Sequence, residues 1–338
     1  MSAALLVRAL REPASVADGC DWTALISAGR AEQLIGTLAF RLEGLALPGR
    51  VERLLAMHRA DAERVRVQAL WEAEMARRAL APLGVPVVLL KGTAFLAAGL
   101  DAAQGRSIGD LDILVPRAAL AEVEQALIGA GWEPMKEGYD DLYYREWMHE
   151  LPPLIHRERD RMIDVHHTIL PLTARPTPDA DVLIAESVAL PDGLRILSRE
   201  GMVIHAAAHL LADGDMAGGL RNLWDIDRLC RQFAGEQDDF YLSLIEDASF
   251  HGLTHAVLRA LRLAQILFGT PVVAYESPAR FNYASRPSDK LFLSRLLSRD
   301  GWGRQTRAGT RFGFYARGHL MRMPPLMLAR HLLKKARG

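Results

Sequence analysis

Apolar residues recur at three- and four-residue steps through the first part of the chain. The segment WTALISAGRAEQLIGTLAFRLEGL (22–45) has this spacing, and so does the more charged segment VERLLAMHRADAERVRVQALWEAEMARRALAPLG (51–84). Such spacing places the apolar side chains on one face of a helix. Pro82 and Gly84 predict the end of the second helix. We therefore predict a helical region over residues 1–83.

The apolar pattern changes after residue 84. A continuous apolar run, VPVVLL (85–90), predicts a buried strand, and DLDILV (110–115) alternates with a period of two, which is typical of a strand. Helical spacing lies in TAFLAAGL (93–100) and RAALAEVEQALIGAGW (117–132). Three further strand candidates follow, LYYREW (142–147), LPPLIHRE (151–158) and RMIDVHHTIL (161–170).

Helical spacing returns later in the chain, in SREGMVIHAAAHLLAD (198–213), GLRNLWDIDRLCRQFAG (219–235) and YLSLIEDASFHGLTHAVLRALRLAQILFG (241–269). Residues 270–287 are rich in Pro, Ser and Asn and predict a loop. The predicted fold class is α+β. A core with a small mixed sheet and helices, residues 84–175, is flanked by helical regions over residues 1–83 and 176–338.

Composition narrows the class of protein. The 338 residues carry a net charge of +0, so no overall field favours nucleic acid or a membrane. The two cysteines, Cys20 and Cys230, show no metal spacing and predict reduced thiols in a cytoplasmic protein. Arg8 and Arg11 interrupt the N-terminal apolar run, which indicates an amphipathic helix and not a signal peptide. No apolar stretch approaches the length of a membrane span.

The segment SIGDLDILV begins a strand with two acidic residues, Asp110 and Asp112. Residues i and i+2 of a strand point to the same face, so these carboxylates lie side by side. They repel each other by only about 1 kcal/mol at ~4 Å in water, and by more in a cleft of lower dielectric constant. A divalent metal with oxygen ligands would balance them, and the alternative is a solvated turn. Without metal, Asp112→Asn is expected to relieve the repulsion and raise thermal stability slightly.

A candidate phosphate site lies at Lys91-Gly92-Thr93, where the first predicted strand turns into a helix. Gly92 would let a ligand approach the backbone closely, and Thr93 would cap the helix. The helix N-terminus favours a phosphate group, and Lys91 adds a full positive charge. The alternative is an ordinary strand-to-helix turn.

A third acid, Asp164, lies between apolar neighbours in RMIDVHH. If its strand lies beside DLDILV, the three carboxylates would hold two Mg²⁺ ions, an arrangement suited to phosphoryl or nucleotidyl transfer. The alternative for Asp164 is an ion pair with Arg161 or Arg157.

The order of these features resembles the polymerase-beta nucleotidyltransferase superfamily. More closely, LLKGTAFLAAGL, RSIGDLDILV and MIDVHHTI resemble the uncharacterised bacterial nucleotidyltransferase family, and the likeness continues through IHAAAH and LRNLWDIDRLC. It implies a polymerase-beta-type core that moves a nucleoside monophosphate from an NTP to an acceptor with release of pyrophosphate. The implied cofactors are two Mg²⁺ ions, with Mn²⁺ as the alternative.

The resemblance also implies roles for individual residues. The metal ligands and catalytic residues would be Asp110, Asp112 and Asp164, and the triphosphate would be held by Gly92 and Thr93 with help from Lys91. Arg106 matches an arginine of the family pattern and would contact phosphate or neutralise the acids. His166 would orient Asp164, touch the substrate or serve a structural role. The chain departs from the superfamily in having Thr after Gly92 and a longer distance from Gly92 to Asp110.

Three other features of the sequence are a second D-x-D motif, a pair of histidines and a basic C-terminal run. Asp225 and Asp227 form a second D-x-D, but on a predicted helix they diverge, which favours a solvated or salt-bridged face. His205 and His209 share a helix face without a third zinc ligand, so helix packing or a polar wall near the cleft is favoured. The run from residue 311 to 338 has seven Lys or Arg and no acid, which indicates a basic outer face or a site for an acidic partner.

Two rival functions follow from the same residues. The metal site would also serve phosphoryl or pyrophosphoryl transfer, or the fold would be a non-catalytic nucleotide-binding module. The acceptor is open among a small molecule, a peptide, a saccharide, RNA and a protein side chain.

Overall fold

The computed structural model describes residues 2–16, 19–136, 138–272, 286–323 and 328. The loop predicted over 270–287 and the basic segment beyond residue 323 lie largely outside these ranges. Within them, no helix is both long enough and apolar enough to cross a membrane.

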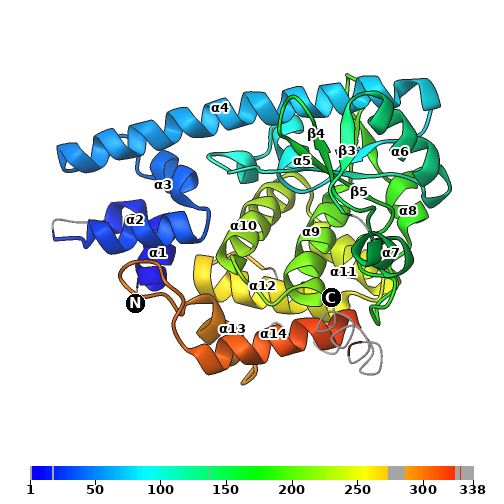
Figure 1. The fold of residues 1–338 in the computed structure, drawn as a ribbon. Coiled ribbons are helices and arrows are strands. Elements are labelled where there is room, and N and C mark those ends of the chain that lie inside the picture. The colour runs from blue at the N-terminus through cyan, green and yellow to red at the C-terminus, as the bar shows by residue number, and fades with distance from the viewer. Residues whose placement is uncertain (1, 17–18, 137, 273–285, 324–327, 329–338) are drawn as a thin grey trace.

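The N-terminal region is helical, as predicted, and contains α1 (Ser2–Arg11), α2 (Trp22–Ala31), α3 (Ile35–Arg41) and α4 (Gly49–Leu80). Asp21 caps α2 by accepting a hydrogen bond from the Ala24 backbone N–H at 2.9 Å. The 32-residue helix α4 runs from the N-terminal helices to the sheet (Figure 1). Its Glu72 is buried there and pairs with Arg159 at 3.0 Å, which joins the long helix to the α+β core.

A seven-stranded mixed sheet forms the α+β core, in the order β3-β4-β5-β2-β1-β7-β6. The strands are β1 (Val88–Leu89), β2 (Leu111–Leu114), β3 (Trp132–Pro134), β4 (Leu154–His156), β5 (Met162–His166), β6 (Val188–Ala189) and β7 (Arg195–Ile196). The central strand β2 is antiparallel to β1 and parallel to β5. The predicted α+β class and mixed sheet are therefore confirmed.

The prediction of a strand at 142–147 is wrong, because this segment belongs to the helix α7 (Gly138–Trp147). Helical spacing lets Tyr143 and Trp147 meet edge to face, with ring centroids 5.5 Å apart. Arg145 pairs with Asp141 one turn away at 2.9 Å. These local contacts outweigh the strand propensity of the aromatic residues.

Three short strands at or next to the edges of the sheet are not predicted from the sequence. β3 has three residues, and β6 and β7 have two each, which is too short for an apolar alternation to be visible. β6 and β7 lie beyond residue 175, so the sheet continues past the boundary predicted for the core.

The remaining helices lie beside the sheet or form the C-terminal region (Figure 1). They are α5 (Lys91–Ala97), α6 (Leu120–Gly129), α8 (Ala180–Ala185), α9 (Arg199–Ala208), α10 (Gly219–Glu236), α11 (Phe240–Phe250), α12 (Thr254–Phe268), α13 (Asp289–Leu296) and α14 (Ala308–Arg322). The π-helical turn His209–Asp213 continues α9, and 3-10 turns lie at Pro13–Ser15, Ala81–Leu83, Asp101–Ala103 and Arg117–Ala119.

The N-terminal and C-terminal helical regions pack against each other. Buried Glu32, directly after α2, pairs with Arg299 at 2.7 Å, and Arg221 of α10 donates to the Thr37 hydroxyl of α3 at 2.7 Å. The division at residues 83 and 175 stays a proposal, and these contacts join its first and last regions.

A close backbone contact fixes the segment that precedes β2. Gly105 lies against Gly36 of α3 so closely that a Cβ atom at either position would overlap the other residue's backbone. The Thr37 hydroxyl donates to the Gln104 carbonyl at 3.2 Å beside this contact. The contact thus sets where Arg106, the next residue, enters the site.

We predict that Gly105→Ala destabilises the protein more than Gly84→Ala does. Both glycines have left-handed backbone, with φ of +67° and +66°, but no heavy atom lies within 4 Å of a Cβ atom built on Gly84. Gly84→Ala should therefore cost only the backbone strain of about 1–2 kcal/mol. Gly105→Ala should cost roughly 1–3 kcal/mol more because of the overlap with Gly36. Denaturant unfolding checks this, and equal losses would contradict the close contact.

Candidate metal and nucleotide site

Three carboxylates meet at the centre of the sheet. The parallel register of β2 and β5 places Asp112 directly beside Asp164, and Asp110 immediately precedes β2. Each of the three residues offers an oxygen, and these oxygens all lie within 4.8 Å of one another. The structure therefore brings together the three acids singled out in the sequence. They could bind a metal ion.

Asp112 is buried and ionised. It accepts hydrogen bonds from Lys91 Nζ at 2.5 Å and from His166 Nε2 at 3.0 Å. Burial opposes the charge of Asp112, but the positive charge of Lys91 and the hydrogen bond from His166 outweigh it and hold the pKa of this carboxyl well below its usual range. The charge of Asp112 thus raises the pKa of Lys91 despite the burial of the ammonium group.

Asp164 has the opposite electrostatic environment. Burial, and then the charges of Asp112 and Asp110, raise the pKa of Asp164 to about 7. Its Oδ1 atom is buried and has no hydrogen-bond partner among the described residues. The arginine pairs considered from the sequence do not form, because Arg161 donates to Gln68 and Arg157 lies 3.9 Å from Glu158. Asp164 is left as an ionisable acid with an unused oxygen.

The expected gain in stability from Asp112→Asn is contradicted by these contacts. Removing the charge of Asp112 would leave Lys91 without its ion-pair partner in a mostly buried site. The repulsion between the acids disfavours the ionised form of the neighbours of Asp112. Burial and the charge of Asp112 raise the pKa of Asp110 as well. The like charges are visible in the sequence, but the pairing of Lys91 with Asp112 is not.

His166 links Asp112 to a second cluster that sequence reasoning missed. Its Nδ1 atom lies 3.4 Å from Glu150 Oε2, and its ring centroid lies 5.1 Å from that of His149. His166 is only 1% exposed, so both ring nitrogens face protein groups. Of the roles considered, orientation of an acid fits this geometry, but the acid is Asp112 and not Asp164. Glu150 reaches His166 through an isolated antiparallel bridge, which no local pattern predicts.

Arg106 pairs with the second D-x-D motif and not with the first. Its guanidinium donates to Asp225 of α10, and Asp225 also accepts from Arg221 at 3.0 Å. Asp227 points elsewhere and pairs with Arg228 and Arg231. The two acids diverge, as the helix argument predicts. Of the two predicted alternatives, the salt-bridged face is confirmed and the solvated one is not, because both acids are buried.

The turn at Lys91 differs in detail from its prediction. α5 begins at Lys91, whose φ is +49°, and Leu90 is the N-cap residue, without a side-chain cap. Thr93 lies inside the helix and is buried, so it does not cap it. The space beside Gly92 is filled by Arg106 and Ile108, and a Cβ atom there would overlap the Arg106 side chain. Gly92 therefore makes room for Arg106.

A cleft of about 800 Å³ opens in front of the acids. It is lined by Asp110, Asp112 and Gly92 and by the cationic residues Lys91, Arg106, Arg221 and Arg299. His209 also lines this cleft, as expected for a polar wall, while His205 is buried in α9. Neither histidine belongs to the clusters of potential metal ligands found among the described residues. The lining of the cleft thus combines two acidic residues with four cationic ones.

Comparisons with known proteins bear on the family of the chain. A family model described as an uncharacterised nucleotidyltransferase matches residues 18–269. A comparison with curated proteins finds no match.

Two solved structures are similar to parts of the chain. One is ANT(2")-Ia in complex with adenylyl-2"-tobramycin, with 14% identity over 49% of this chain and 90% of that chain, and a TM-score of 0.35. The other is JHP933 from Helicobacter pylori, with 16% identity over 60% of this chain and 92% of that chain, and a TM-score of 0.32. Because the family model spans most of the chain, the protein belongs to the uncharacterised nucleotidyltransferase family and is a transferase of that class.

Proposed function

We propose that the protein transfers a nucleoside monophosphate from an NTP to an acceptor in a metal-dependent reaction and releases pyrophosphate. The observation that carries this proposal is the meeting of Asp110, Asp112 and Asp164 at the paired strands β2 and β5, with Asp110 and Asp112 also lining a large cleft that carries several cationic residues. Family membership supports the reaction class.

The three acids fit divalent metal ions. Carboxylate oxygens are the preferred ligands of Mg²⁺, and Asp164 Oδ1 is a buried acceptor without a hydrogen-bond partner in the described structure. The proposed ligands are Asp110, Asp112 and Asp164, for two Mg²⁺ ions or for Mn²⁺. When bound, the ions would neutralise charge on the reacting phosphate and polarise the attacking oxygen.

The cleft fits the triphosphate of an NTP. Its volume of about 800 Å³ lies within the usual range for small-molecule sites. Lys91 and Arg106 line it next to the acids and would bind phosphate oxygens. Gly92 contributes by leaving room for the Arg106 side chain, and His166 by holding Asp112 in place. Thr93 is buried, so a role in binding phosphate would run through the backbone of the turn.

Asp164 is suited to accept a proton from the acceptor. Its Oδ1 has no hydrogen-bond partner in the described structure and, without bound metal, burial and the neighbouring acids raise the pKa of this carboxyl to about 7. Asp112 is the weaker base, because Lys91 and His166 hold the pKa of its carboxyl well below its usual range. In this proposal Asp112 supplies a fixed negative charge, and Asp164 accepts the proton.

Without metal, Asp164→Asn should stabilise the protein at pH 8. The folded-state pKa of Asp164 is raised from 3.8 to about 7, so the folded protein holds this proton more tightly than the unfolded chain. Stability contributed by Asp164 therefore falls as the pH rises from about 4 to about 7, by at most roughly 4 kcal/mol. Unfolding in EDTA should show the gain from Asp164→Asn at pH 8 and almost none at pH 4.

The matched variant Asp112→Asn should behave in the opposite way. It breaks a mostly buried ion pair and should cost about 3–5 kcal/mol at pH 8. The pKa of Asp112 is lowered in the folded protein, so the stability it contributes is present above its unfolded value near 3.8 and is lost as the pH falls below it. A stabilised Asp112→Asn protein, or a destabilised Asp164→Asn protein at pH 8, would contradict the described electrostatics.

The proposed activity is tested by the dependence of NTP binding and turnover on Asp112. A non-hydrolysable NTP with Mg²⁺ should raise the melting temperature of the wild type, and Asp112→Asn should lose this increase. Turnover should fall at least ~10³-fold, since metal binding and charge stabilisation disappear together. Asp181→Asn, at an exposed acid in the first turn of α8, is the control and should keep both properties.

The reaction itself is read from its products. The protein is incubated with Mg²⁺, mixed NTPs and a cell extract, and mass spectrometry searches for an acceptor that has gained a nucleoside monophosphate. Pyrophosphate should appear with it. Release of NDP or AMP instead would indicate phosphoryl or pyrophosphoryl transfer, and NTP binding without any product would indicate a binding module.

A further inference from the structure

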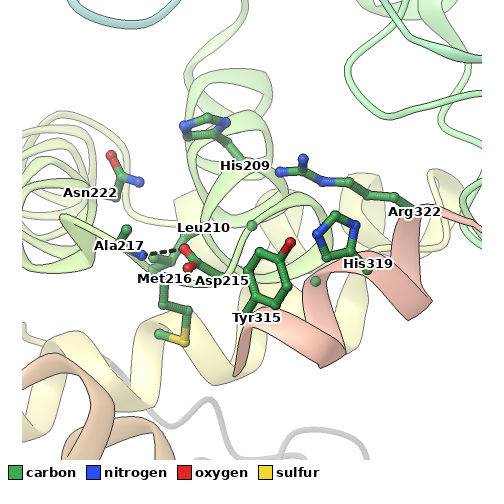
Figure 2. Close-up of a pocket in the computed structure, with 11 residues that line it drawn as sticks. His209, Leu210, Asp215, Met216, Ala217, Asn222, Tyr315, His319 and Arg322 are labelled. Carbon is green, nitrogen blue, oxygen red and sulfur yellow. Dashed lines mark hydrogen bonds between the residues drawn. The ribbon is translucent and has the colours of Figure 1, made fainter. Parts of the chain in front are cut away.

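A second cavity, which we term the α14 pocket, lies between the π-helical turn His209–Asp213, the loop 214–218 and α14 (Figure 2). Its volume is about 330 Å³, which suits a small molecule of the size of an amino acid or a sugar. Its polar lining comes from His209, Asp215, Asn222, Tyr315, His319 and Arg322.

The α14 pocket adjoins the nucleotide cleft. His209, Ala217 and Asn222 line both cavities, so the two spaces share a wall. A molecule in the α14 pocket would therefore lie next to an NTP bound in the cleft. This is the relation that a transfer reaction requires between donor and acceptor.

Arg322 is the cationic residue among the described groups that line the α14 pocket. Asp215 is its sole acidic residue among the described lining groups. Its carboxylate accepts from the Ala217 backbone N–H at 2.9 Å and lies 3.8 Å from buried Arg295, which offsets its charge. On the opposite wall, Arg322 reaches from α14 toward His209, and His319 lies beside it (Figure 2). The lining thus favours an anionic group near Arg322.

We infer that the α14 pocket binds the acceptor, and that the acceptor is a small molecule with a hydroxyl group and an anionic group held by Arg322 and His319. This inference rests on the proposed nucleotidyl transfer. The acceptor oxygen bonds to the α-phosphorus of the NTP, and the bond from that phosphorus to the bridging oxygen breaks. Pyrophosphate leaves with the electron pair, and the hydroxyl proton is released to solvent. The anionic group is a carboxylate or a phosphate.

The inference is tested by binding four small hydroxyl compounds that differ in charge. The probes are glycerate, glycerol 3-phosphate, glycerol and ethanolamine, titrated by NMR with Mg²⁺ and a saturating non-hydrolysable NTP so that the cleft is filled. One or both anions should bind, and the neutral and cationic probes should not. Arg322→Ala should weaken anion binding at least ~10-fold, as for loss of a charge-assisted hydrogen bond. Arg311→Ala, at an exposed arginine of the same helix, should leave it unchanged.

The outcomes separate the inference from the proposed function. Binding of glycerate alone or of glycerol 3-phosphate alone supports the pocket and identifies the anion. Preferred binding of ethanolamine, or anion binding that survives Arg322→Ala, overturns it. An increase in the melting temperature of the wild type and of Arg322→Ala with Mg²⁺ and NTP would show that the cleft binds NTP, independently of the α14 pocket. If that stabilisation is present and no anion binds, the inference fails while the proposed function stands.

Discussion

Asp112 carries a negative charge inside the sheet, between Lys91 and His166. The Lys91 ammonium group comes from the turn after β1, and the imidazole from the end of β5, so the ion pair depends on the pairing of three strands. The strand register places Asp164 beside Asp112, and burial together with this neighbouring charge disfavours the ionised form of Asp164. One acid is therefore fixed as a carboxylate, and the other titrates near neutrality. A cation in this position is needed for stability, and a metal ion would satisfy the same electrostatic requirement.

Segments that are far apart in the sequence fix the position of a cationic residue near the pair of Asp112 and Lys91. Arg106 is fixed on one side by the contact of Gly105 with Gly36 and on the other by its ion pair with Asp225. The N-terminal helices, the core and α10 thus meet at one arginine that lines the cleft. A cationic wall held by buried carboxylates keeps its position before any ligand arrives, which reduces the ordering cost of binding.

The sequence predicted the parts of this site that depend on strand geometry. The alternation in DLDILV and RMIDVHH is enough to place Asp112 and Asp164 on strands, and adjacent strands bring them together. Contacts between distant segments could not be read in the same way. The pair of Arg106 with Asp225 spans 119 residues, and the approach of Glu150 to His166 depends on one isolated bridge. The helix α7 was mistaken for a strand because contacts within its own turns outweigh the propensity of its aromatic residues.

The most direct test of the account is the position of the metal ions. Crystals grown with Mn²⁺ and a non-hydrolysable NTP would show each ion by anomalous diffraction. We predict two Mn²⁺ peaks among the carboxylates of Asp110, Asp112 and Asp164, with Lys91 displaced from Asp112 toward the phosphates. Peaks confined to the cluster of His149, Glu150 and His166, or no ion at the three aspartates, would contradict it.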